Sequence, residues 1–244
     1  MDIVRTVVRR ELAAYFTTPL AYVFIVIFLA LAGAFAFFLG GFFERGQADL
    51  ESFFVFHPWL YLFLVPAVAM RLWAEERRTG TIELLMTLPA STFQIVLGKF
   101  LAAWIFTGIA LALTFPFWLT VNYLGEPDNG VILAAYLGSW AIAGAFIAIG
   151  ACASALTKNQ VIAFVLGAAI CFLFLMSGVD LVLAAFRGWA PDWVVDLVAS
   201  FSLITHFNEL AKGVINAATA VYLATLVGVC WLVNTLIVDL EKAR

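Results

Sequence analysis

The sequence predicts an all-α membrane protein with six transmembrane helices, on the strength of its composition and the spacing of its charged residues. Of the 244 residues, 65% are hydrophobic and 12% are charged, and the mean hydropathy is +1.05. Soluble domains average roughly 45–50% apolar and about 25% charged residues. Because so few polar side chains cannot cover a water-soluble globule, the composition excludes a soluble enzyme. The net charge of −3 and the pI near 5.3 leave no basic excess for binding nucleic acid.

Six long stretches lack Asp, Glu, Lys and Arg, or carry them only near their ends, which is the pattern of membrane-spanning helices. A helix rises about 1.5 Å per residue, so about 20 apolar residues cross roughly 30 Å of hydrocarbon. The first stretch exceeds the apolar region of a signal peptide, about 7–15 residues, so we expect it to remain in the protein. We predict one transmembrane domain over residues 1–244, with spans at about 20–43, 53–73, 92–122, 131–156, 160–180 and 214–238.

The basic residues predict the orientation of these spans. Ten of the 13 Lys and Arg residues lie in the N-terminal segment, in the second-to-third and fourth-to-fifth connections, and at the C-terminus. Arg45, Arg187 and Lys212 lie on the opposite side. By the positive-inside rule, both termini of this multi-pass protein are expected in the cytoplasm.

No pattern in the sequence predicts a catalytic, nucleotide-binding or metal site. There is no Gly-x-x-x-x-Gly-Lys-Ser/Thr loop, no His-Glu-x-x-His and no Cys-x-x-Cys. The two histidines, His57 and His206, are predicted as polar groups at the outer face of the membrane. No charged residue lies in the middle of a predicted span, which argues against an ion-coupled secondary transporter. We therefore expect no enzyme activity, no cofactor and no metal in this chain.

Residues 2–16 predict an amphipathic helix that lies along the inner leaflet. Apolar residues recur every three or four positions, up to Tyr15 and Phe16, while Arg5, Arg9 and Arg10 fall mostly on the other face. A basic amphipathic helix of this kind binds membrane lipid through anionic headgroups. The proline of Thr17-Thr18-Pro19 then ends the helix, because proline disfavours helix at the residue before it. A simple membrane anchor is the alternative.

A short helix is predicted at about 80–89, between the second and third spans. Gly80 permits a sharp turn before it and Pro89 ends it. Its apolar residues on one side are Ile82, Leu85 and Met86. Because two turns are too short to be stable alone in water, we expect this side to bind a cleft on another protein. An ordinary charged loop is the alternative.

Three further connections complete the pattern. Ser91 and Gln94 have the spacing of a capping box at the start of the third span. Residues 157–160 indicate only a polar turn between two helices. Residues 181–212 combine charges and a proline with Trp189 and Trp193, and predict short helices at the outer interface. This outer segment either gates a pathway or serves as an aromatic anchor.

Taken together, these segments resemble the permease subunits of type-2 ABC transporters, a family with six spans per subunit. Residues 10–22, Arg-Glu-Leu-Ala-Ala-Tyr-Phe-Thr-Thr-Pro-Leu-Ala-Tyr, are similar to the family's connecting helix. Residues 75–89 are similar to its coupling helix and 156–160 to its second cytoplasmic contact. Residues 202–215 are most similar to the gliding-motility (Gld) type branch, and less closely to the copper-processing permease of nitrous oxide reductase maturation.

The resemblance implies an exporter-like permease that couples ATP hydrolysis by a separate ATPase subunit to movement of a substrate across the bacterial inner membrane. The ATPase would hold ATP and Mg²⁺ and bind the coupling helix. A second permease subunit, identical or different, would complete the pathway, with a possible extracytoplasmic partner. The alternative is a mechanotransmission or scaffold subunit that moves an extracytoplasmic partner without transporting a substrate.

The candidate site residues fall into four groups, none of them catalytic or metal-binding. The ATPase-coupling residues are Glu75, Glu76, Arg77, Arg78, Gly80, Thr81, Ile82, Glu83, Leu84, Leu85, Met86 and Pro89. The second cytoplasmic contact comprises Thr157, Lys158, Asn159 and Gln160. The interfacial helix contributes Arg5, Arg9, Arg10, Tyr15 and Phe16, and the outer segment contributes Trp189, Trp193, His206 and Phe207.

Overall fold

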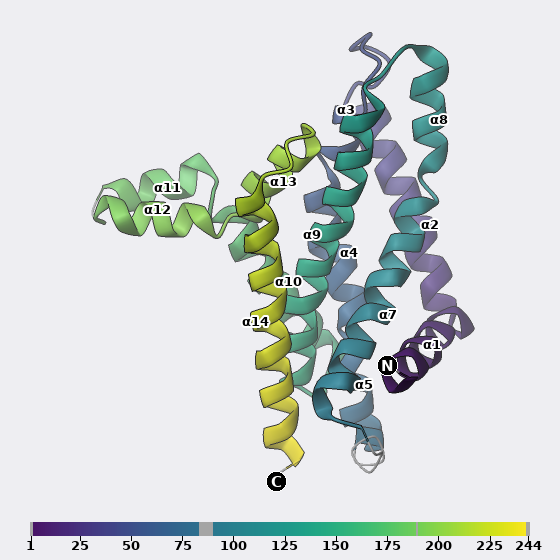
Figure 1. Cartoon of the computed structure of the whole chain (residues 1–244), viewed down its shortest axis with the longest axis vertical. Coiled ribbons are helices and arrows are strands. Elements are labelled where there is room, and N and C mark those ends of the chain that lie inside the picture. Colours follow the sequence, from purple (N-terminus) through teal and green to yellow (C-terminus); the bar gives the residue numbers. More distant parts are fainter. Residues whose placement is uncertain (1, 83–89, 189, 243–244) are drawn as a thin grey trace.

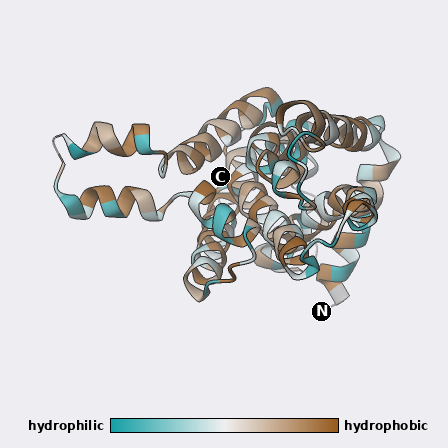
Figure 2. Cartoon of the chain, turned by 90° about the horizontal axis from the view of Figure 1, so that it is seen from above, coloured by the Kyte–Doolittle hydropathy of each residue, from teal (hydrophilic) through white to brown (hydrophobic). Residues whose placement is uncertain are grey.

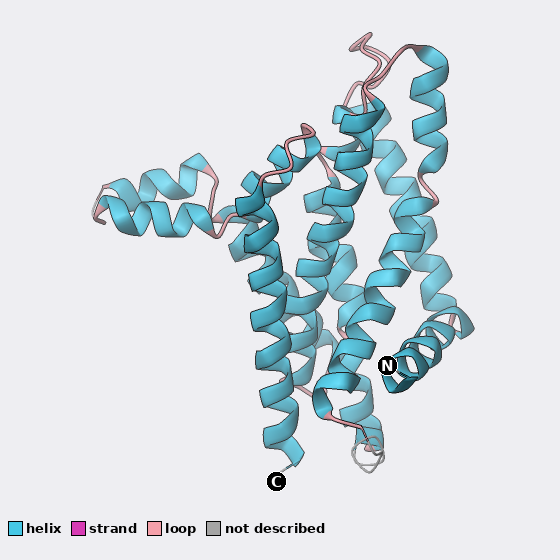
Figure 3. Ribbon diagram, viewed as in Figure 1, coloured by secondary structure: helices cyan, strands magenta, loops and turns pink. Residues whose placement is uncertain are grey.

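The computed structural model describes residues 2–82, 90–188 and 190–242, and within these ranges every regular element is a helix (Figure 3). The long helices run side by side along one axis, and both chain termini lie at the same end of this bundle (Figure 1). The prediction of an all-helical, multi-pass architecture is confirmed.

The chain begins with α1 (Asp2–Thr17), which leads into α2 (Pro19–Ala34) and its π-helical extension η1 (Phe35–Leu39). The next helices are α3 (Glu51–Phe54), α4 (His57–Ala69), α5 (Arg71–Thr79), α7 (Thr92–Ala112), α8 (Phe115–Leu124) and α9 (Asn129–Ala155). The second half contains α10 (Gln160–Met176), α11 (Asp180–Arg187), α12 (Asp192–Ser200), α13 (Leu203–Ala211) and α14 (Ala217–Lys242).

Five helical segments of the described chain are long and apolar enough to cross a membrane. They are Ala21–Leu39, Glu51–Thr79, Thr92–Leu124, Asn129–Ala155 and Ala217–Glu241. Two bent pairs, α10 with α11 and α12 with α13, raise the number of candidate spans to seven if each pair counts as one. The predicted six lies within this range.

One predicted span differs from the observed helices. The predicted span at 160–180 ends early, because α10 stops at Met176 and the chain bends by 74° into α11. Hydropathy alone does not reveal this bend, because the helices on both sides of it are mainly apolar. The predicted span at 92–122 agrees with the candidate span Thr92–Leu124, within which α8 follows α7 and Pro116 occupies the first turn of α8.

Helix α9 lies at the centre of the bundle and contacts α4, α5, α7, α10, α13 and α14. Its Ala- and Gly-rich sequence allows these close approaches. A Cβ atom at Gly150 would lie 2.6 Å from the Cβ atom of Ala69 in α4, and one at Gly138 would lie 2.6 Å from that of Leu210 in α13. Small residues therefore set how tightly the other helices pack around α9.

Helices α4 and α5 follow one another in a single candidate span and are separated by a break at Met70. Ser154 of α9 forms hydrogen bonds on both sides of this break. The Ser154 hydroxyl donates to the Met70 carbonyl oxygen at 2.7 Å and accepts from the backbone nitrogens of Trp73 at 3.1 Å and Ala74 at 3.0 Å. One hydroxyl thus uses its donor and both lone pairs to satisfy backbone groups that the break leaves without helical partners.

The outer segment contains three helices, of which α11 and α12 extend sideways from the bundle as a hairpin (Figures 1 and 2). Hydrophobic and hydrophilic residues alternate around both helices (Figure 2). Trp193 on α12 is exposed, and Trp189 lies outside the described residues. Helix α13 returns to the bundle and packs against α9 and α10, with Phe207 fully buried.

One of the two histidines is not an interfacial group of the kind predicted. His57 is completely buried, and its Nδ1 lies 3.1 Å from the Phe53 carbonyl oxygen inside a cluster of aromatic rings. His206 is partly buried and stacks on Tyr222 with 4.3 Å between ring centroids, and its Nδ1 lies 3.0 Å from Thr219 Oγ1. Both side chains contribute to helix packing.

Candidate functional site

Four segments that are distant in sequence meet at the end of the bundle that carries both termini. They are α1, α5 with the residues after it, the turn between α9 and α10, and the last turns of α14 (Figure 1). Hydrogen bonds and ion pairs join these segments to one another.

The α9–α10 turn is fixed to α5. The Gln160 side chain donates to a carboxylate oxygen of Glu75, and the Arg77 guanidinium donates to the Ala155 carbonyl oxygen. The turn is also ordered from within, because Asn159 Oδ1 accepts from the backbone nitrogen of Val161 at 2.9 Å and so caps α10. The two segments for which ATPase contact is expected are therefore adjacent in space.

The exposed residues of this turn are Leu156, Lys158 and Asn159, of which Asn159 is engaged in capping α10. Thr157 is half-buried, and its Oγ1 accepts from the backbone nitrogen of Asn159 at 3.1 Å. The turn thus presents one apolar and one basic side chain on a rigid backbone.

The end of α14 is tied to the same region. Arg77 Nη2 lies 2.8 Å from Glu241 Oε1, and the Arg77 side chain is only 9% exposed. Thr92, at the start of α7, donates to Asp239 Oδ1 at 2.5 Å. Asp239 and Glu241 carry no motif that would single them out in the sequence, so their role in assembling this end was missed.

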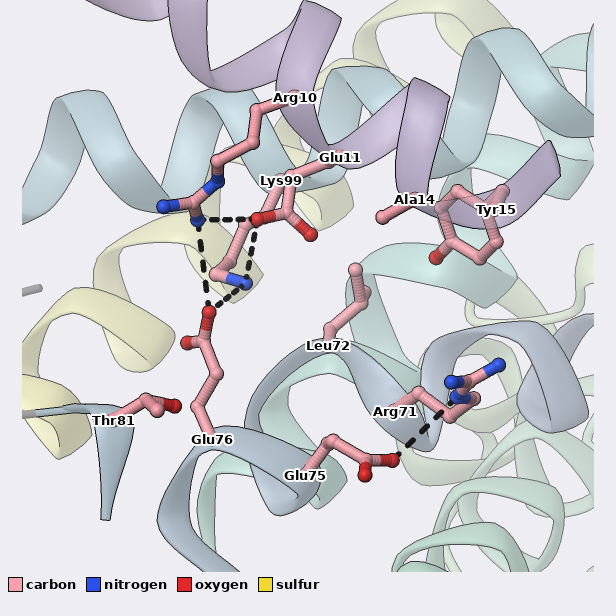
Figure 4. A pocket seen from close by; sticks show the side chains of 10 residues that line it. All are labelled: Arg10, Glu11, Ala14, Tyr15, Arg71, Leu72, Glu75, Glu76, Thr81 and Lys99. Carbon is pink, nitrogen blue, oxygen red and sulfur yellow. Dashed lines mark hydrogen bonds and ion pairs between the residues drawn. The ribbon is translucent and has the colours of Figure 1, made fainter. Parts of the chain in front are cut away.

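A buried group of charges joins α1, α5 and α7. Lys99 Nζ lies 3.2 Å from Glu11 Oε1 and 2.8 Å from Glu76 Oε1, and its side chain is 2% exposed (Figure 4). Arg10 Nη2 adds contacts to Glu11 at 2.5 Å and Glu76 at 3.7 Å. Lys99 also lies 5.3 Å from the ring centroid of Trp73. Lys99 is one of the basic residues that the sequence assigns to the connection between the second and third spans, and it is instead a buried residue of α7.

Glu11 remains a carboxylate in this group. Burial raises its pKa, but Lys99 and Arg10 lower it by more, so the pKa lies below its ordinary value. Glu76, which was expected to help set the polar contacts with an ATPase, is instead turned inward to Lys99 (Figure 4). Its carboxylate holds α5 against α1 and α7.

The end of α5 has the turn that the sequence predicts. Gly80 adopts φ +73°, a left-handed conformation that glycine tolerates best, and directly follows the last residue of α5. Thr81 and Ile82 begin a new helical turn, while Arg78 at the end of α5 is exposed. The expected coupling residues Glu83, Leu84, Leu85, Met86 and Pro89 lie outside the described residues.

The chain re-enters the bundle at the predicted capping box, which is confirmed. Ser91 Oγ accepts from the backbone nitrogen of Gln94 at 3.3 Å, and Gln94 Oε1 accepts from that of Ser91 at 3.1 Å. This reciprocal pair fixes the start of α7.

Helix α1 packs against α7 as well as presenting a basic face. Arg5 and Arg9 are exposed, whereas Tyr15 is buried and stacks on Phe106 of α7 with 4.9 Å between ring centroids. Phe16 meets the same ring edge-on at 5.7 Å. The helix is therefore packed into the bundle through α7.

In the described part of the chain, no group of three or more His, Cys, Asp or Glu side chains is placed to hold a metal ion. What this end of the bundle does offer is a surface of exposed residues on a rigid support. We call Arg78, Gly80, Thr81, Leu156 and Lys158 the docking surface.

Comparison with known families gives one match. A model described as "ABC-2 family transporter protein" matches residues 48–237, which is more than half of the 244-residue chain. The matched range runs from the loop before α3 into α14 and includes both parts of the docking surface. No curated protein matches the chain.

Proposed function

Because the chain belongs to the ABC-2 family of transporter proteins, we propose that it is the permease subunit through which a separate ATPase drives movement of a substrate across the bacterial inner membrane. The fold has the multiple apolar helices that such a subunit requires. An ABC-2 permease works in general with a partner ATPase, which would carry ATP and Mg²⁺.

The observation that carries this proposal is the arrangement of the docking surface. Two connections far apart in sequence, one after α5 and one between α9 and α10, form adjacent parts of a single face through the contacts of Gln160 and Arg77. A partner that binds this face would hold both connections at once. The coupling helix of residues 80–89 would supply further apolar contact, as the sequence predicts.

The contacts behind the docking surface suggest how motion would spread. Helix α5 continues into α4, and Ser154 locks their junction to the central helix α9. Lys99 of α7 joins α5 and α1 through its ion pairs with Glu76 and Glu11. A displacement of α5 by an ATPase would therefore move several spans together.

The branch of the family, the transport direction and the partner subunit are proposed from the sequence resemblance. We place the chain in the gliding-motility type branch from residues 202–215, with an exporter-like direction, both termini in the cytoplasm and a second permease subunit beside it. Helix α13 lies within this segment, and the Ser202 side chain caps it by accepting from the backbone nitrogen of Thr205 at 3.2 Å. An extracytoplasmic partner would bind at the opposite end of the bundle.

The test is co-purification of ABC ATPases with a tagged chain from native membranes. Leu156→Asp places a charge on the docking surface, where burial of a leucine contributes about 1.5–3 kcal/mol. Recovery of the ATPase should fall about tenfold or more, since about 1.4 kcal/mol corresponds to a factor of ten. Leu124→Asp is the matched control, because Leu124 is 55% exposed, as against 57% for Leu156, and lies at the other end of the bundle.

Equal ATPase recovery with both variants, at equal membrane abundance, would contradict the docking surface. ATPase binding without any substrate flux in reconstituted vesicles would instead favour a mechanotransmission subunit.

A further inference from the structure

A cavity of about 560 Å³ lies between α1, α5 and the start of α7 (Figure 4). At one side of it, Arg10, Glu11, Lys99 and Glu76 form the buried charge group described above. At the other side, Arg71 lies beside Glu75, and Tyr15 faces the same space from α1 (Figure 4). The volume falls in the range of about 300–1,000 Å³ that is typical of small-molecule sites.

The cationic and hydroxyl groups on the two sides of this cavity differ in whether they have hydrogen-bond acceptors among the described residues. Arg10 and Lys99 both hold carboxylates at hydrogen-bond distance. Arg71, in contrast, has one ion pair with a described residue, from Nε to Glu75 Oε2 at 3.6 Å, and donates no hydrogen bond to the described part of the chain. The Tyr15 hydroxyl likewise has no hydrogen-bond partner among the described residues.

These groups stay in donor form. Burial, and secondarily the Glu11 carboxylate, raise the pKa of the Tyr15 phenol, so it keeps its proton. The Arg71 guanidinium is always charged and can present two parallel N–H groups to a phosphate. Two donors that lack described acceptors therefore line the same cavity from different helices.

The position of the cavity along the bundle matches a lipid headgroup. Arg71 is the first residue of α5 and lies two positions after the end of α4, whose residues 57–69 contain no Asp, Glu, Lys or Arg. The other wall is the amphipathic helix α1. The apolar side chains of Leu72 and Ala14 lie between the two polar sides (Figure 4). Such a change from apolar to charged residues marks the level of headgroups in a membrane.

The charge of the lining points to the kind of headgroup. Three cations, Arg10, Arg71 and Lys99, face three carboxylates, Glu11, Glu75 and Glu76, so the lining is neutral overall. A neutral lining suits a headgroup that is itself neutral overall, because burying a net charge without a counter-charge is costly. Glu75, which also accepts hydrogen bonds from Arg78 at 2.9 Å and from Gln160, lies beside Arg71, where an ammonium next to a phosphate would meet it.

We propose that this cavity binds the headgroup of a zwitterionic, ethanolamine-type phospholipid from the adjoining leaflet, with its phosphate on Arg71 and Tyr15 and its ammonium toward Glu75. The bound lipid bridges α1 and α5. This inference does not rest on the proposed function, because it needs no ATPase and no substrate.

The test is native mass spectrometry of the delipidated, detergent-solubilised chain titrated with phosphatidylethanolamine, phosphatidylglycerol or soluble phosphoethanolamine. The wild type should retain one phosphatidylethanolamine more tightly than phosphatidylglycerol. Arg71→Gln should bind it more weakly, by about tenfold or more, since the phosphate loses its hydrogen bonds to a charged guanidinium. Tyr15→Phe should weaken binding about threefold to tenfold while keeping the ring on Phe106.

Arg9→Gln is the charge-matched control, because Arg9 is exposed on α1 and does not line the cavity. It should bind phosphatidylethanolamine like the wild type. Wild-type affinity in both Tyr15→Phe and a folded Arg71→Gln would overturn the site. If Arg71→Gln fails to fold, Tyr15→Phe decides alone. Equal or tighter binding of phosphatidylglycerol would overturn the zwitterionic assignment, and competition by phosphoethanolamine as strong as by the lipid would show a soluble ligand instead.

Discussion

Replacing Lys99 by Met is expected to destabilise the fold by about 3 kcal/mol. The variant keeps most of the side-chain volume but removes the buried cation between Glu11 and Glu76, whose side chains are 16% and 15% exposed, and leaves the more exposed Arg10 beside them. The distances of 3.2 Å and 2.8 Å from Lys99 Nζ put their two Oε1 atoms no more than 6.0 Å apart. At an effective dielectric constant of about 20, like charges at that separation repel by about 3 kcal/mol. Removal of one member of a buried ion pair typically costs about 3–5 kcal/mol.

The assay is thermal unfolding in lipid nanodiscs, followed by intrinsic tryptophan fluorescence. For a chain of this size, about 3 kcal/mol corresponds to a fall in apparent Tm of roughly 6–12 °C. Arg10→Gln is the control, because the Arg10 side chain is 49% exposed and its loss should cost less than about 1 kcal/mol. Adding Glu76→Gln to Lys99→Met should recover part of the lost stability, since it removes one of the two repelling charges.

The pH dependence gives a second readout. In the wild type the pKa of Glu11 is lowered, so its carboxylate stabilises the fold above its ordinary pKa of 4.5, and this contribution is lost as pH falls through the lowered pKa of the folded state. In Lys99→Met, burial persists while a main lowering influence is gone, so the Glu11 pKa should rise and protonation should relieve the repulsion. The difference in Tm between variant and wild type should therefore shrink from pH 7 to pH 5. An unchanged Tm together with wild-type pH dependence would refute this account of Lys99.

Three other predictions test the packing and the orientation of the bundle. Ser154→Ala should lower stability by about 1–3 kcal/mol, measured by the same unfolding assay, because buried backbone groups at the helix break lose their partner. Gly98→Ala should cost about 1–3 kcal/mol, because the new Cβ would lie 2.7 Å from Val7 Cγ1, and Val7→Ala in the same chain should restore stability. In a background without the three native cysteines, a cysteine at Asp128 should react with an impermeant thiol reagent from outside and one at Thr79 should not; the reverse labelling would overturn the proposed orientation.

Local features of this protein were predictable because they depend on residues close in sequence. The Gly80 turn and the Ser91–Gln94 capping box each involve a few neighbouring residues, and both appear as expected. The amphipathic pattern of residues 2–16 likewise matches a helix, α1, with nearly the same bounds. Composition was sufficient for the all-helical membrane class, because a bilayer requires backbone groups to be satisfied within each apolar segment.

The candidate site was predictable only in part. The turn at 157–160 indicated nothing beyond a polar connection, and only the tertiary structure places Gln160 against Glu75. Lys99 counted as a loop charge, because its neighbours in the sequence do not show that α1 and α5 cover it. Pairings of this kind depend on which faces of distant helices meet, and a periodic pattern within one helix does not contain that information.

The sequence by itself determined that the chain is a set of apolar helices, where most of them begin and end, and which connections carry the basic residues. It did not determine which helix is central. Helices α9 and α14 are almost equally hydropathic, yet 72% of the most apolar window is buried in α9 and 17% in α14. The physical reason is that lipid and protein interiors are both apolar, so hydropathy cannot separate a helix that faces lipid from one that faces other helices. Only the tertiary structure, through close-packed glycines and buried polar pairs, shows that α9 is the central helix.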